Sequence, residues 1–146
     1  MKVVRFSSAE SYEPEKDWKR VSLCNEEDIS IEHFIKPAHH ASPMHDHPNA
    51  QVLVVLKGKL AIITDGSGEQ VLGEGDAAYI PGNEPHVVKN LLDVPSIGLD
   101  IFVPGRSFDF TSMLEKRGPL DWITIEFCVD PHIFCNIFSS FSQQHP

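Results

Sequence analysis

The chain reads HDHPNAQVLVVL at residues 45–56, and the expected fold follows from this stretch. Its second half, 51–56, is an almost continuous apolar run, as expected for a strand buried on both faces. Its first half contains His45 and His47, and residues two apart in an extended chain point to the same side. The stretch therefore predicts a buried strand with two imidazoles side by side at its entrance.

Short segments of the same kind, separated by turn residues, surround this stretch. Asp65-Gly66-Ser67-Gly68 is typical of a hairpin turn, and no helical period or internal repeat appears between 31 and 110. Many short strands with Gly and Pro punctuation predict an all-β domain that closes into a barrel or sandwich. We expect strands at 31–35, 51–56, 60–64, 70–72, 77–80, 86–91 and 97–103.

The two ends of the chain differ from this central part. Residues 1–30 are polar and charged, and are expected to form an N-terminal arm or edge strands. Residues 31–110 are assigned to the barrel. Residues 111–146 are read as an extension with one alternating strand at 123–129 and a short helix over 133–141, started by Asp130-Pro131. The extension is too apolar for a solvated linker and is expected to pack on the barrel or on a second subunit.

Length and charge restrict the class of protein. The 146 residues suffice for one domain with its own core. A net charge of -9 without a basic patch argues against nucleic acid and anionic membranes as partners. No secretion signal or membrane span is recognisable, so we expect a cytoplasmic protein. Cys24, Cys128 and Cys135 show no CxxC spacing and are expected to be reduced.

Four residues are candidate metal ligands. His45 and His47 share a side, Gln51 follows at an even offset, and His86 begins a strand directly after the turn at 81–85. Imidazoles and a carboxamide oxygen suit a divalent late first-row metal and leave positions open for substrate. An HxH pair also occurs by chance on surface loops. The other histidines have no spacing partner, although His39-His40 lies close enough to be a pair at the rim.

A second group of candidates follows the last barrel strand. Asp100 and Phe102 lie two apart and share a face, so both point into the barrel if one does. A carboxylate there is costly unless it is paired or functional. Arg106 follows a Pro-Gly turn and can reach back to grip a substrate carboxylate. The alternative is that Asp100 and Arg106 form a purely structural ion pair.

These residues fall into two spaced motifs. The first runs His45-Asp46-His47, three residues, Gln51, six residues, Gly58. The second runs Gly75, five residues, Pro81, then His86 and, after three residues, Asn90. Together they resemble the two signature motifs of the cupin superfamily, in small single-domain form. The resemblance implies a double-stranded β-helix, also called a jelly-roll barrel of the RmlC-like type, with one divalent metal ion: Zn, Ni, Fe, Mn or Co.

The motifs depart from the usual cupin pattern at two positions. Gln51 replaces a glutamate and removes one negative charge from the metal ligands. Asn83 replaces the second glycine of the turn, and Asn tolerates the positive φ that such a turn requires. The turn is therefore expected to survive, while a bound metal ion would be a stronger Lewis acid.

The segment Asp100-x-Phe102-x-Pro104-x-Arg106 adds a narrower resemblance. Together with the ligand pattern, it is similar to small pectin-degradation cupins that linearise unsaturated uronates. That resemblance implies ring opening of a 4,5-unsaturated monouronate, with Asp100 moving the proton, Arg106 binding the carboxylate and Phe102 stacking on the sugar.

Two other functions remain open at this stage. One is a metal-dependent cupin dioxygenase, and the other is a non-enzymatic module that binds or senses a sugar or other small molecule. The expected partners are a small-molecule substrate, in the preferred interpretation a carboxylate, and a second copy of the chain in a homodimer.

Overall fold

The computed structural model describes residues 1–106, which contain one short 3-10 helix, η1 (Phe6–Ser8), and nine strands. The strands are β1 (Ser11–Glu15), β2 (Trp18–Asn25), β3 (Ser30–Lys36), β4 (Ala50–Lys57), β5 (Leu60–Thr64), β6 (Gly68–Leu72), β7 (Ala77–Ile80), β8 (His86–Asn90) and β9 (Ser96–Val103).

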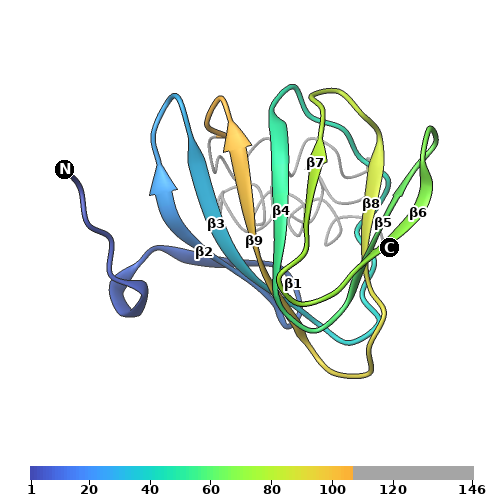
Figure 1. Cartoon of the computed structure of the whole chain (residues 1–146). Coiled ribbons are helices and arrows are strands. Elements are labelled where there is room, and N and C mark those ends of the chain that lie inside the picture. Colours follow the sequence, from blue (N-terminus) through green and yellow to red (C-terminus); the bar gives the residue numbers. More distant parts are fainter. Residues whose placement is uncertain (107–146) are drawn as a thin grey trace, which may run out of the picture. The chain divides into compact units, whose positions relative to one another are not determined.

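These strands form two antiparallel sheets (Figure 1). The larger sheet has the order β1-β2-β3-β9-β4-β7, and the smaller one has the order β6-β5-β8. The chain passes from the larger sheet to the smaller one after β4, returns for β7, and crosses again to β8 and back to β9. This alternation between two sheets is jelly-roll connectivity, so the predicted all-β fold of short strands is confirmed.

The core lies between the sheets. Leu53 and Val55 of β4 are buried in it, whereas Val52 and Val54 are only half-buried. The expectation that this strand is buried on both faces is therefore wrong, because alternate residues project from the outward face of the larger sheet. The core consists of Phe34, Leu53, Val55, Leu60, Ile62, Ile80 and Val88.

The turn at 81–85 places His86 beside the histidine pair. Asn83 has a φ of 63°, which confirms that asparagine supports the left-handed backbone here. Its N–H donates to the carbonyl of His47 at 2.7 Å. A Cβ on Gly82 would lie 2.3 Å from the carbonyl oxygen of Pro48, so only glycine permits this close approach. The turn is thus packed directly on the segment that enters β4.

The N-terminal residues extend the larger sheet. β2 pairs with β3, and β1 pairs with β2, both in antiparallel register. Within residues 1–106 no helix is long and apolar enough to cross a bilayer. The strand expected at 123–129 and the helix expected over 133–141 lie outside the described residues.

Candidate metal centre

Three histidines converge from two segments of the chain. His45 and His47 lie on the segment that enters β4, and His86 is the first residue of β8. The backbones of His45 and His86 pair with each other, with N–O distances of 3.1 and 2.9 Å. This bridge brings one ligand-capable nitrogen of each of the three rings within 4.8 Å of the others. Such a spacing allows all three nitrogens to bind one metal ion.

Backbone carbonyls fix the orientation of each imidazole ring. Because a carbonyl can only accept, each Nδ1 that contacts one carries the proton, and the Nε2 of the neutral ring carries a lone pair. The Nε2 of His86 is buried and has no hydrogen-bond partner among the described residues. A metal ion would supply that partner. The contacts are His45 Nδ1 to Pro43 O at 2.9 Å, His47 Nδ1 to Asn49 O at 2.8 Å, and His86 Nδ1 to Glu84 O at 2.8 Å.

Burial also favours the neutral form of two of these rings. It lowers the pKa of His45 to about 4, and it is the main cause that lowers the pKa of His47. Metal ions bind imidazole in its neutral form. The two rings are therefore ready to bind a metal at neutral pH without first losing a proton.

Gln51 adds an oxygen to the three nitrogens. Its Nε2 donates to Oδ1 of Asp100 at 2.7 Å, which turns its Oε1 towards Nε2 of His47, 3.0 Å away. Both facing atoms are acceptors when the imidazole is neutral, and two acceptors this close repel each other unless a cation lies between them. The residues present therefore fit a divalent metal ion bound by His45, His47, Gln51 and His86.

This geometry explains the glutamine at position 51, where the motif that the sequence resembles has a glutamate. The partner of its amide is the carboxylate of Asp100, which needs a donor. A glutamate at this position would place two carboxylates against each other in a buried site, which is unfavourable.

Asp100 forms its ion pair with Arg20 of β2, at 2.5 Å, and not with Arg106. The alternative of an Asp100–Arg106 structural pair is therefore wrong among the described residues. The Arg20 Nε also contacts Glu32, whose Cα lies opposite that of Asp100 in the β3–β9 register. Strand pairing thus decides the partner, because it places Arg20 next to both carboxylates.

One guanidinium serves two buried carboxylates in this cluster. Burial raises the pKa of Glu32 to about 7, Arg20 opposes that shift, and the negative charge of Asp100 adds to it. The cluster of Arg20, Glu32 and Asp100 is almost fully shielded from solvent. It forms a rigid support behind the amide of Gln51.

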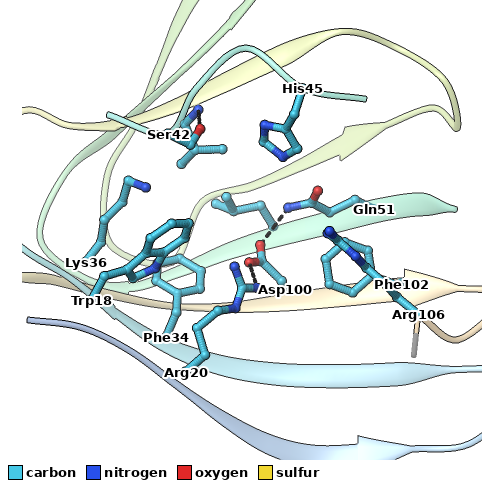
Figure 2. A pocket seen from close by; sticks show the side chains of 12 residues that line it. Trp18, Arg20, Phe34, Lys36, Ser42, His45, Gln51, Asp100, Phe102 and Arg106 are labelled. Carbon is cyan, nitrogen blue, oxygen red and sulfur yellow. Dashed lines mark hydrogen bonds and ion pairs between the residues drawn. The ribbon is translucent and has the colours of Figure 1, made fainter. Parts of the chain in front are cut away.

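A pocket opens beside two of the candidate metal ligands, His45 and Gln51 (Figure 2). Phe102 packs edge-on against His47, with ring centroids 5.3 Å apart, and the Arg106 guanidinium lies 5.3 Å above the Phe102 ring. The lining consists of Trp18, Arg20, Phe34, Lys36, Ser42, His45, Gln51, Leu53, Val88, Asp100, Phe102 and Arg106.

Sequence reasoning missed the part of this pocket that comes from β2 and β3. Trp18 and Arg20 lie in the segment expected to form an arm or edge strands, and Lys36 lies one residue beyond the strand expected at 31–35. The inward face of β3 consists of its buried residues, which are Ser30, Glu32, Phe34 and Lys36. Their alternation with the half-buried residues between them is the signal in the sequence that could have placed Lys36 beside the pocket.

The remaining histidines of the described part have other contacts. His33 packs against Phe6, with ring centroids 4.9 Å apart. His40 contacts Glu15 at 2.9 Å and packs on Trp18, which lines the pocket, whereas His39 is exposed. His132 and His145 lie outside the described residues.

Residues 32–102 match the family model described as "Cupin domain". All four metal-ligand candidates lie inside the match, whereas Trp18, Arg20 and Arg106 line the pocket from outside it. No curated protein matches the sequence.

Solved structures share the fold of this chain at low sequence identity. An RmlC-like cupin from Shewanella frigidimarina superimposes with a TM-score of 0.66 and 21% identity, over 73% of this chain and 94% of that one. KdgF from Halomonas sp. gives 0.66 and 19%, over 73% and 96%. A third structure, from Thermus thermophilus, gives 0.59 and 23%, over 71% and 98%.

Proposed function

We propose that this protein is a metal-dependent enzyme that opens the ring of a 4,5-unsaturated uronate or a similar sugar acid. The observation that carries the proposal is a single pocket that joins the metal-ligand candidates His45 and Gln51 to Asp100, Phe102 and Arg106. These are the residues in which the sequence resembles uronate-linearising cupins. A cytoplasmic location, expected from the sequence, is compatible with such a substrate.

The ligand set suits chemistry at a sugar oxygen. Three imidazoles and one carboxamide are neutral, so a bound divalent ion would keep its full charge and act as a Lewis acid on the substrate. Zn, Ni, Fe, Mn and Co all accept such ligands.

The pocket residues would divide the remaining tasks. Arg106 has no ion pair with any described residue and would bind the substrate carboxylate through its guanidinium fork. Phe102 would pack on the apolar face of the sugar ring. Asp100 is held by Gln51 and Arg20, so its carboxylate is immobile and can exchange protons at a defined place.

The proposed reaction is an isomerisation. The bond between C1 and the ring oxygen breaks, the C1 hydroxyl loses its proton, and C1 becomes an aldehyde. The ring oxygen becomes an enol at C5, which turns into a ketone when its oxygen loses a proton and C4 gains one. Asp100 would take up and return these protons, so nothing is oxidised or reduced.

An NMR assay of ring opening tests this proposal. Zn- or Ni-loaded protein, kept free of oxygen, is expected to convert a 4,5-unsaturated galacturonate into its open-chain keto form faster than the spontaneous reaction. Asp100→Asn should abolish the acceleration, since Asn cannot exchange the proton, while Asp93→Asn on the exposed surface should not. Equal rates with and without the loaded protein would contradict the proposal.

A cupin dioxygenase is the second candidate, because three histidine ligands also leave room for O₂ and substrate on a redox metal such as Fe or Cu. Strict dependence on Fe(II) and consumption of O₂ would favour it over ring opening.

A non-enzymatic binding module is the third candidate, favoured by a pocket that joins two candidate metal ligands to charged and aromatic side chains. Saturable binding of a uronate that stays chemically unchanged would favour this function.

A further inference from the structure

Lys36 is a buried cation that forms no ion pair with a carboxylate of residues 1–106. The residue is only 2% exposed, yet its side chain lines the pocket. Among residues 1–106 its ammonium group forms no hydrogen bond or ion pair. Burial lowers the pKa of Lys36 to about 8, against the opposing effect of the Asp100 carboxylate. Keeping an unpaired ammonium in such a place is costly unless it serves a ligand.

The surroundings of Lys36 partly offset that cost. Its ammonium lies 4.4 Å from the centre of the Trp18 ring, a cation–π contact that stabilises charge without neutralising it. Ser42 lines the same pocket, and its oxygen accepts from the N–H of Val88, which leaves its O–H proton for another acceptor. This end of the pocket therefore offers one charged donor and one neutral donor.

The cations of the pocket are separated in space. Figure 2 shows Lys36, Trp18 and Ser42 on one side of Asp100, and Phe102 and Arg106 on the other.

Their charges are compensated differently. Arg20 is compensated by Glu32 and Asp100, whereas Lys36 and Arg106 have no ion pair with a described residue. Among the described residues, the pocket thus has two positive charges without an ion pair, Lys36 and Arg106, in addition to the candidate metal ligands His45 and Gln51.

We propose that Lys36, with Trp18 and Ser42, forms a second anion subsite, so that the preferred ligand is a sugar acid with anionic groups at both ends. This inference rests on the proposed function, which assigns the first carboxylate to Arg106. The second group is a carboxylate or a phosphate, because both offer several acceptor oxygens to an ammonium group.

Calorimetric titration of the full chain, loaded with Zn, tests the subsite with three probes. D-galacturonate carries one carboxylate, galactarate carries one at each end, and galacturonate 1-phosphate replaces the second with a phosphate. Wild-type protein is expected to bind at least one of the two dianions about tenfold more tightly than galacturonate. The dianion that binds more tightly identifies the second group as a carboxylate or a phosphate.

Substitution at Lys36 should remove this preference alone. Lys36→Met is expected to weaken binding of the preferred dianion by about tenfold and to change galacturonate binding by less than about threefold. Lys57→Met, which removes an exposed lysine at the end of β4, is the matched control and should behave as wild type. Lys36→Gln repeats the test if the methionine variant melts early.

The outcomes separate the two proposals. The subsite would be overturned if wild-type protein bound all three probes with equal affinity or bound none of them. It would also be overturned if the preference for a dianion survived substitution at position 36. Arg106→Met is expected to weaken all three probes. Galacturonate binding that is unchanged in Arg106→Met would contradict the carboxylate contact assigned to Arg106. The subsite would still be supported in that case if the preference for a dianion depended on Lys36.

Discussion

Gln51 donates its amide proton to Asp100, and this one contact decides which atom of Gln51 faces the histidines. The 2.7 Å bond fixes Nε2 on the Asp100 side and leaves Oε1 facing His47. Arg20 holds Asp100 in turn, at 2.5 Å. A chain of charge-assisted contacts from β2 through β9 to β4 thereby orients a metal-ligand candidate.

Reversing the donor and acceptor of this pair tests it directly. Gln51→Glu removes the donor and sets two carboxylates together, so the metal-free protein is expected to lose about 1–3 kcal/mol of unfolding free energy at pH 7. The double variant Gln51→Glu/Asp100→Asn restores a donor and should recover more than half of the loss. Urea denaturation measures both. Single and double variants of equal stability would show that the bond has no such role.

Removal of His86 should remove the metal. Elemental analysis of untreated wild-type protein is expected to find about one divalent ion per chain, and His86→Ala should lose most of it, because two imidazoles and a weakly binding carboxamide hold a divalent ion far less tightly than three imidazoles do. His39→Ala is the matched control, since His39 is exposed and lies outside the group of three converging histidines. Retention of stoichiometric metal by the His86 variant would contradict the assigned site.

Glu32 should make stability fall as the pH rises. Its pKa of about 7 in the folded protein lies above the ordinary value of 4.5, so the folded state binds this proton more tightly than the unfolded state. The stabilisation is complete below about pH 4.5 and disappears as the pH rises to about 7. Glu32→Gln cannot titrate and should reduce the loss between pH 4.5 and 8 by about 1–3 kcal/mol.

Denaturation of both metal-free proteins at a series of pH values provides the measurement. The difference between the two curves isolates Glu32, because every histidine is common to both. Parallel curves would contradict the raised pKa.

The outward face of the larger sheet is the expected contact in a homodimer. Val54 and Leu99 are paired across β4 and β9 and are half-buried on that face. Val54→Lys would place like charges opposite each other between two copies, so light scattering after gel filtration should show a dimer for wild type and a monomer for the variant. Val71→Lys, on exposed β6, should remain dimeric. A monomeric wild-type protein would contradict the expectation.

Local patterns in the sequence were sufficient for much of this structure. Alternation and turn residues predicted the strands of the barrel, because side-chain period and backbone preference are properties of a few neighbouring residues. Asn83 was expected to adopt a positive φ, and it does. The spacing of His45, His47 and Gln51 likewise depends on an extended backbone over a short distance.

The residues that support the site are known only from the folded chain. Arg20, Glu32 and Asp100 meet because β2, β3 and β9 are neighbours in one sheet, and no short stretch of sequence records that order. The same pairing places Lys36 in the pocket and gives Asp100 a different arginine from the one nearest in sequence. Strands and ligand spacing could be predicted because they are local. The partner of each charged side chain could not, because it depends on contacts between segments that are far apart until the chain folds.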